Sequence, residues 1–295
     1  MPETEQQVAN WFELAKAAAD AGNHDEAYRY FTKILEVNPK DPDAWFGKAV
    51  AAGWGSGLRG DRYDEMLSGI QRAVDNAPDD KKGKLSRKGA KAILGVTLAY
   101  FKLSIKHTAE YIALDDTWKE HIQRCISMLF ALKAANLLDP KNREVLENGI
   151  QLTKSMIEGV EYQDPYDTDS DGDPKTKVKH LPEAVEQDIR KEMDDFVAKL
   201  KAMDPNYQAP TIEKAGGEIT AGGVLGCLVI VIALGIGGWW CVGKARAKLS
   251  DDKPAEAPAV TAPVATAEPN PAPAPTPTVT APTKKPTKPG KGPGK

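Results

Sequence analysis

Cysteine and histidine are scarce in this sequence of 295 residues, which contains three Cys and four His. Two of the cysteines, Cys227 and Cys241, lie in a long apolar run, so the rest of the chain contains only Cys125. One cysteine cannot form an intrachain disulfide framework or a cysteine-rich zinc site. The histidines are scattered without an accompanying nucleophile or metal ligand. The sequence therefore predicts no assembled catalytic site and no enzymatic activity.

An excess of positive charge is also missing, because the formal net charge is −3 and the isoelectric point is about 5.9. This balance argues against a general nucleic-acid binder, so we expect no nucleic-acid partner. The first residues, MPETEQQVANWFELAK, are acidic and amphipathic. They lack the basic and apolar segments of a secretory signal, so no cleaved signal peptide is predicted.

One long apolar segment stands out from this polar background. Residues 219–243, ITAGGVLGCLVIVIALGIGGWWCVG, carry no charge and lie between Glu218 and Lys244. As a helix they would rise about 37 Å, enough to cross a hydrocarbon core of about 30 Å with some tilt. We therefore predict a single-pass transmembrane helix with the lipid bilayer as a partner; a buried core helix is the alternative. Trp239 and Trp240 fit an interfacial aromatic anchor.

Small residues recur on one face of this predicted span, at Gly222, Gly226, Ala233 and Gly237. Such residues allow two membrane helices to approach closely and to dimerise through packing. A homodimer through the span is therefore one hypothesis. The alternative is a chance match, because the motif is common in glycine-rich spans.

The predicted span divides the chain into unequal parts. Residues 1–212 are predicted to form a helical domain with a polar loop at 163–181, and residues 213–218 a linker. Residues 244–295 are rich in proline, alanine, threonine and lysine. This composition buries too little apolar surface to offset the entropy of ordering, so a disordered tail is predicted.

The N-terminal part contains a repeated pattern. Trp45 follows Trp11 by 34 residues, and the alanines after each tryptophan keep that interval: Ala15 and Ala18, then Ala49 and Ala52. Each copy predicts two helices joined by a turn, and each closes at a proline, Pro39 or Pro78, because proline cannot continue a helix. A short insertion, GWGSGLRG, interrupts the second copy.

This pattern resembles the tetratricopeptide repeat, a helix-turn-helix unit of 34 residues. The resemblance is specific over residues 8–80 and implies an all-α fold of stacked helix pairs that bury a continuous core. Two degenerate copies follow, one from 91–113 with 127–140 and one from 142–162 with 197–205. The connection inside the third copy is expected to be longer than in the family, and an irregular helical bundle is the alternative over residues 90–205.

In the family that the sequence resembles, the first helices of successive repeats line a concave groove that binds peptides. The resemblance places five residues on or near that face: Phe12, Lys16, Asp43, Phe46 and Val50. Some members hold a peptide carboxylate with lysine and asparagine, but Val50 occupies a position that would need asparagine. An apolar groove floored by Phe12 and Phe46 is therefore the favoured form. The alternative is that both phenylalanines pack between the repeats.

The predicted loop contains alternating aspartates that resemble the first half of a calcium-binding loop. The candidate ligands are Asp167, Asp169, Asp171 and Asp173, and Gly172 would allow the sharp turn. Val178 stands where a bidentate glutamate is needed, which departs from the pattern. Calcium is thus the one cofactor for which the sequence offers candidate ligands. The favoured alternative is a solvated acidic loop that binds no cofactor.

These features predict a membrane-anchored scaffold or adaptor that recruits a protein or peptide partner. The first alternative is a structural or regulatory subunit of a membrane or envelope assembly that captures no peptide. An enzyme with an unrecognised helical active site is the second alternative.

The signals for membrane orientation disagree. Lys244, Arg246 and Lys248 directly follow the span, and the positive-inside rule would place the tail in the cytoplasm. Against this, no signal is visible before the domain, and a short disordered tail is easier to export than a folded domain. We favour a cytoplasmic location for the repeat domain.

Overall fold

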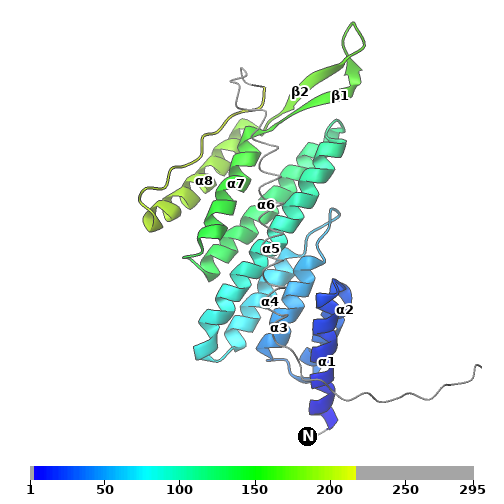
Figure 1. Cartoon of the computed structure of the whole chain (residues 1–295), viewed down its shortest axis with the longest axis vertical. Helices are drawn as coiled ribbons and strands as arrows, with labels where there is room; N and C mark the ends of the chain where they lie inside the picture. Colours follow the sequence, from blue (N-terminus) through cyan, green and yellow to red (C-terminus); the bar gives the residue numbers. More distant parts are fainter. Residues whose placement is uncertain (1–2, 217–295) are drawn as a thin grey trace, which may run out of the picture. The chain divides into compact units, whose positions relative to one another are not determined.

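The computed structural model describes residues 3–216, which form eight α-helices and one antiparallel β-hairpin (Figure 1). The helices form four consecutive pairs, in which the two members pack together and each pair packs against the next. The pairs are α1 (Glu3–Asp20) with α2 (His24–Val37), α3 (Pro42–Trp54) with α4 (Tyr63–Asn76), α5 (Asp79–Tyr111) with α6 (Asp115–Leu138), and α7 (Arg143–Glu158) with α8 (Glu183–Met203). The prediction of a predominantly helical domain with repeat-like pairs is confirmed.

Two helices of the first two pairs, α2 and α3, begin at residues whose side chains cap the helix. The side chain of Asn23 accepts a hydrogen bond from the Glu26 amide at 3.3 Å, and Asp41 does the same for the Ala44 amide at 2.8 Å. Each cap satisfies one of the amides that an α-helix leaves free at its start. Pro42 then occupies the first turn of α3, where a missing amide hydrogen costs little.

The first pair meets α3 through small residues. A core cluster of α1, α2 and α3 residues contains Phe31 and Ile34 among buried alanines such as Ala15 and Ala44. The ring of Phe31 lies directly against Gly47 on α3, so closely that a Cβ atom at that position would overlap the ring. The repeated alanines and this glycine therefore set how closely the helices approach.

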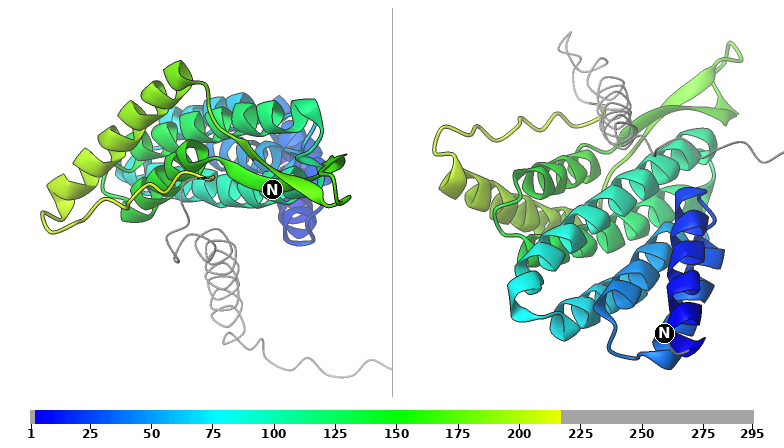
Figure 2. Two further views of the ribbon diagram at one scale, coloured as in Figure 1. Left: turned by 90° about the horizontal axis from the view of Figure 1, so that it is seen from above. Right: turned by 60° about the horizontal axis from the view of Figure 1, so that its bottom comes forward.

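The third pair uses the two longest helices of the described residues, and a second core cluster extends from α3 to α8. Figure 2 shows α5 and α6 lying side by side. The prediction of a long connection between these two helices is wrong, because only residues 112–114 join them. In the first turns of α6 the buried positions include the polar residues Thr117, His121 and Arg124. The sequence there therefore lacks the regular apolar spacing that predicts a helix.

The expected loop at 163–181 was also wrong, since most of it forms a hairpin of β1 (Val160–Thr168) and β2 (Pro174–Lys179). Cross-strand pairs stabilise this polar hairpin. The Lys177 ammonium contacts the carboxylates of Asp164 and Asp167 at 2.8 and 2.9 Å, and Gln163 donates to Thr176 at 2.9 Å. A polar composition predicts a loop, but here oppositely charged side chains pair between the two strands.

Several predicted features lie outside the described residues: the span at 219–243, its packing face at Gly222, Gly226, Ala233 and Gly237, and the tail at 244–295. Between residues 3 and 216, no helix is both long and apolar enough to cross a membrane.

Candidate functional site

The predicted groove residues Phe12 and Phe46 lie on α1 and α3, and both are half-buried. Phe12 packs edge-on against Phe31, with ring centroids 6.2 Å apart. Phe46 packs against the cores that α4 and α5 contribute. Each ring is therefore partly used in packing and partly open to solvent, and the two contact different core clusters. An apolar groove between them stays a prediction.

The other predicted groove residues differ in exposure. Lys16 is exposed and pairs with Glu13 at 3.0 Å, while Asp43 is exposed in the first turn of α3. Val50 is half-buried on α3. Lys16 and Asp43 are thus both open to solvent, and Val50 contributes apolar surface.

Sequence reasoning missed a cluster of aromatic and charged side chains at the junction of α2, α3 and α4. The Tyr28 hydroxyl donates to Glu65, and the Arg62 guanidinium donates to the same carboxylate at 2.6 and 3.0 Å. Lys48 and Arg62 each lie 4.7 Å from the centre of the Tyr28 ring. Burial opposes ionisation of Glu65, but the hydrogen bonds from Tyr28 and Arg62 lower its pKa overall.

This junction joins the first helix pair to the second through side chains separated by more than 30 positions in the sequence. Trp45 extends it, because its indole donates to the Pro39 carbonyl at 2.8 Å and Arg72 lies 4.7 Å from its ring. Cation–π contacts of this kind add about 0.5–1 kcal/mol each at exposed sites. The junction thus holds the orientation of α3 on which the predicted groove depends.

Residues 8–51, which cover most of α1, all of α2 and most of α3, match the family model of the tetratricopeptide repeat. The chain contains a tetratricopeptide-type helical repeat. Among solved structures it is similar to one titled "Crystal structure of MamA protein", with 10% sequence identity and a TM-score of 0.26. That match covers 70% of this chain and 100% of the other. Comparison with curated proteins gives no significant match.

Beyond the tetratricopeptide-type repeat, the aspartate-rich segment forms the turn of the hairpin. Asp169 accepts hydrogen bonds from the amides of Asp171 and Asp173 at 2.9 and 3.0 Å. Lys175 and Lys177 pair with both carboxylate oxygens of Asp167, which lowers its pKa to about 2. Within residues 3–216 no group of three or more His, Cys, Asp or Glu side chains is arranged to hold a metal ion. The calcium hypothesis stays a prediction.

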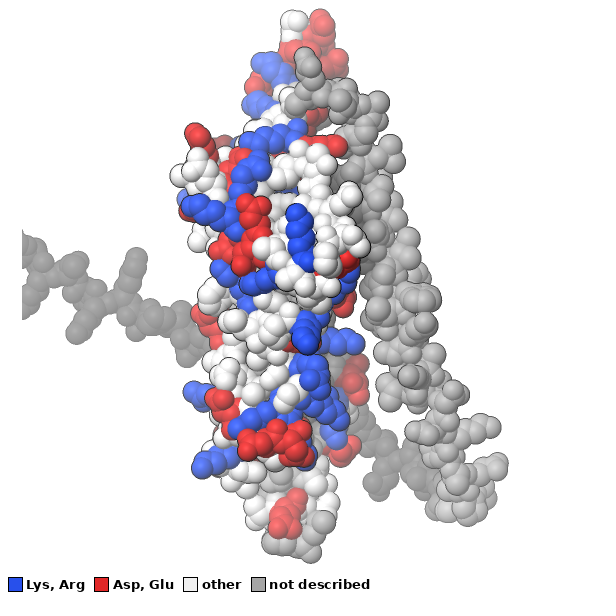
Figure 3. All heavy atoms as spheres, turned by 90° about the vertical axis from the view of Figure 1, so that its left-hand side faces the viewer, with Lys and Arg blue, Asp and Glu red and all other residues white. Residues whose placement is uncertain are grey.

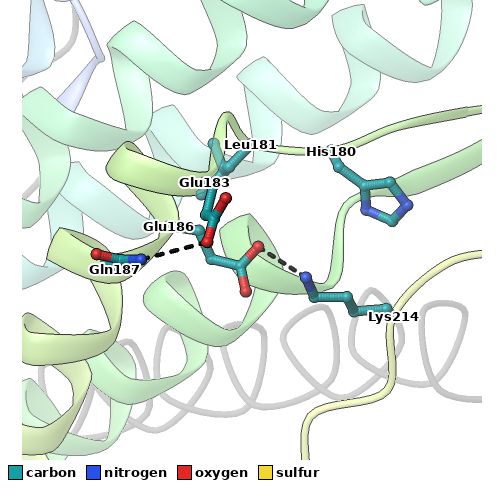
Figure 4. Close-up of a pocket in the computed structure, with 6 residues that line it drawn as sticks. All are labelled: His180, Leu181, Glu183, Glu186, Gln187 and Lys214. Atoms are coloured by element: carbon teal, nitrogen blue, oxygen red, sulfur yellow. Dashed lines mark hydrogen bonds and ion pairs between the residues drawn. The ribbon is translucent and has the colours of Figure 1, made fainter.

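A small cleft of about 430 Å³ lies where the hairpin returns to α8 (Figure 4). Figure 4 shows Glu186 pointing toward Lys214, and their charged groups are 2.8 Å apart. Gln187 donates to Glu183 at 3.5 Å on the same wall. These polar groups are thus paired with one another, and Lys214, from the segment that follows α8, forms part of the wall of the cleft.

Hydrogen bonds to Glu158 fix the same segment, which begins after Met203. The Glu213 amide donates to the Glu158 carboxylate, and the Ala215 amide donates to the Glu158 carbonyl, both at 2.9 Å. Residues 213–215 of the predicted linker are therefore held against α7 and α8.

The face of the domain seen in Figure 3 carries interspersed acidic and basic side chains. Neither sign covers that face continuously, which agrees with the small net charge of the chain. Attraction of a highly charged polymer to this face would therefore be weak.

Proposed function

We propose that this chain is a membrane-anchored scaffold whose helical repeat domain recruits a protein partner. The observation that carries the proposal is the tetratricopeptide-type repeat at residues 8–51, extended by further helix pairs as far as Met203. Stacked helix pairs of this type present an extended surface and are commonly used to bind proteins. The repeat therefore supports a role in protein interaction.

The proposed anchor is the apolar run at residues 219–243. It begins three residues after Gly216, and the preceding segment is tied to Glu158 by two hydrogen bonds. An uncharged run of this length favours a bilayer over water by burial of apolar surface. We place the repeat domain on the cytoplasmic side. Protection of the domain from external protease in sealed cells supports this orientation, and its digestion there overturns it.

The recruiting surface proposed for the partner is the face of α1 and α3 that bears Phe12 and Phe46. Both rings keep part of their surface open to solvent, and Lys16 and Asp43 are exposed nearby in sequence. A half-buried aromatic anchor with charged residues at its rim is typical of protein-binding hot spots.

Affinity capture with the full-length chain tests this surface. The Phe12→Ala and Phe46→Ala variants are compared with wild type and with Leu14→Ala, which removes an exposed apolar side chain elsewhere on α1. We expect each phenylalanine change to reduce partner recovery about tenfold or more, because hot-spot truncation costs about 2 kcal/mol. Circular dichroism confirms folding. Equal recovery by folded Phe12→Ala, Phe46→Ala and Leu14→Ala variants contradicts the proposed surface and favours an assembly subunit without peptide capture.

A further inference from the structure

A larger cleft, of about 810 Å³, lies between the α3–α4 connection and the facing sides of α5 and α6. The connection contains most of the GWGSGLRG insertion and folds back on itself through paired hydrogen bonds between Gly57 and Gly60. Leu58 and Arg59 of this turn form one wall, and Tyr100 of α5 and Arg124 of α6 lie on the other side. The insertion into the second repeat therefore creates a concavity that two plain helix pairs would not have.

Arg124 has an unusual environment for an arginine, because only 7% of the residue is exposed. Its Nε donates to the Ser104 hydroxyl at 3.0 Å, and its Nη1 lies 3.3 Å from the Leu58 carbonyl. Its Nη2 atom is buried and has no hydrogen-bond partner among residues 3–216. Burying a guanidinium donor without a partner is unfavourable, so this group calls for an acceptor.

The carboxylate that contacts Arg124 within the chain is a weak partner. Glu120 reaches Nη1 at 3.4 Å, and its side chain is 57% exposed. Bidentate arginine–carboxylate pairs have two short bonds of about 2.7–2.9 Å, and this contact has one long bond. Exposed Glu120 can therefore be displaced at low cost by another carboxylate that approaches the guanidinium from the cleft.

The charges around the cleft favour a single carboxylate over a highly charged anion. Arg59 and Lys119 add positive charge, but Asp61 and Asp116 oppose it. Together with the pair of Arg124 and Glu120, the lining is balanced, so it offers no net attraction to the additional negative charges of a polyanion.

The exposed surface beside the cleft indicates that the carboxylate belongs to a protein segment. Ile126 and Phe130 follow Lys119 on the same face of α6, and both are exposed, with Phe130 at 62%. Residues four positions apart on a helix are neighbours on its surface. A peptide with an acidic residue in the cleft could place adjacent apolar side chains on this stripe.

We infer that this cleft binds a carboxylate carried by an acidic, partly apolar segment of a protein partner, with the Arg124 guanidinium as the principal donor. In the unbound chain, Glu120 stands in for the partner's carboxylate. The inference deepens the proposed recruiting function, but the cleft is separate from the α1–α3 face. Loss of binding at either surface can therefore be distinguished from loss at the other.

The test measures binding of two blocked peptides to the full-length chain by isothermal titration calorimetry. One is acetyl-Leu-Glu-Leu-amide, and the other replaces the glutamate by glutamine. Succinate is titrated in parallel, because it distinguishes a free dicarboxylate from a peptide-borne one. We expect wild type to bind the glutamate peptide and to discriminate against the glutamine peptide. Glu120→Gln should tighten binding about threefold by removing the competing carboxylate.

Two arginine variants complete the test. Arg124→Lys keeps the charge but loses the planar fork, so binding should weaken about tenfold or more. Arg87→Gln changes an exposed arginine of α5 outside the cleft and should bind like wild type. If Arg124→Lys does not fold, the Glu120→Gln comparison and the peptide discrimination remain decisive.

Equal binding of the two peptides overturns the inference, as does unchanged binding by folded Arg124→Lys. So does the failure of all carboxylate probes to bind wild type and Glu120→Gln at millimolar concentration. Tighter binding of succinate than of the glutamate peptide retains Arg124 as the carboxylate site but overturns its assignment to a protein segment.

Discussion

At the scale of single residues, His121 lies buried on α6 among polar groups. Its Nδ1 is 2.9 Å from the Ser104 hydroxyl, and its Nε2 is 3.5 Å from the Cys125 sulfur. Burial, followed by the nearby Arg124 charge, lowers the pKa of His121 to about 4. The imidazole is therefore neutral at pH 7, and folding opposes its protonation.

This burial predicts an acid-sensitive contribution to stability. The unfolded chain takes up a proton on His121 near pH 6.5, while the folded chain does so only near pH 4. The contribution is present above pH 6.5 and is lost as the pH falls toward 4, by about 2–3 kcal/mol at pH 4.5. Urea unfolding of wild type and His121→Gln at pH 7.5 and 4.5 measures it. The difference between the two proteins should shrink at low pH; a difference independent of pH contradicts the prediction.

Gly47 gives a second residue-scale prediction. Gly47→Ala improves helix propensity by about 1 kcal/mol, but the added methyl overlaps the enclosed Phe31 ring. Overpacking costs about 1–3 kcal/mol, so we expect a net loss of about 1 kcal/mol in the free energy of unfolding. Gly83→Ala is the matched control, because it lies in exposed helix with space for a methyl. It should be neutral or stabilising, and stabilisation of both variants would show that Phe31 does not confine Gly47.

At the scale of elements, the first two helix pairs could be predicted because the apolar spacing and the closing prolines agree there. The start of α6 could not be predicted, because its buried positions include His121 and Arg124. Burial of these side chains depends on partners elsewhere in the fold. The hairpin was missed for a related reason. Its stability comes from cross-strand pairs such as Asp164 with Lys177, and a single strand shows only polar residues.

Glu158 holds the segment after α8 through two hydrogen bonds. Glu158→Ala removes the acceptor for the Glu213 amide while leaving the Glu158 carbonyl bond to Ala215. A lost hydrogen bond of about 1–1.5 kcal/mol should speed tryptic cleavage after Lys214 about fivefold to tenfold, through more frequent local opening. Mass spectrometry of timed digests of the full-length chain measures this rate.

Glu161→Ala is the matched control for that experiment, because Glu161 is an exposed glutamate on the neighbouring strand. It should be cleaved after Lys214 at the wild-type rate. If Glu158→Ala is cleaved no faster than Glu161→Ala, the hydrogen bond from Glu213 does not hold the segment.

At the scale of the whole molecule, sequence reasoning identified the repeat because a fixed interval of 34 residues survives in Trp11 and Trp45. It missed the cleft at Arg124, although the GWGSGLRG insertion marked one wall of it. Only the folded chain shows that the insertion faces α5 and α6. The proposed membrane anchor rests on residues 219–243, whose uncharged composition is a property of the sequence.

The most direct test of membrane-anchored recruitment is the distribution of the captured partner between membrane and soluble fractions. The comparison uses cells that express the full-length chain or a chain lacking residues 219–243, at matched levels. We predict that the partner sediments with membranes in the first case and moves to the soluble fraction, bound to the shortened chain, in the second. The same partner distribution in both cells would contradict recruitment to the membrane by this protein.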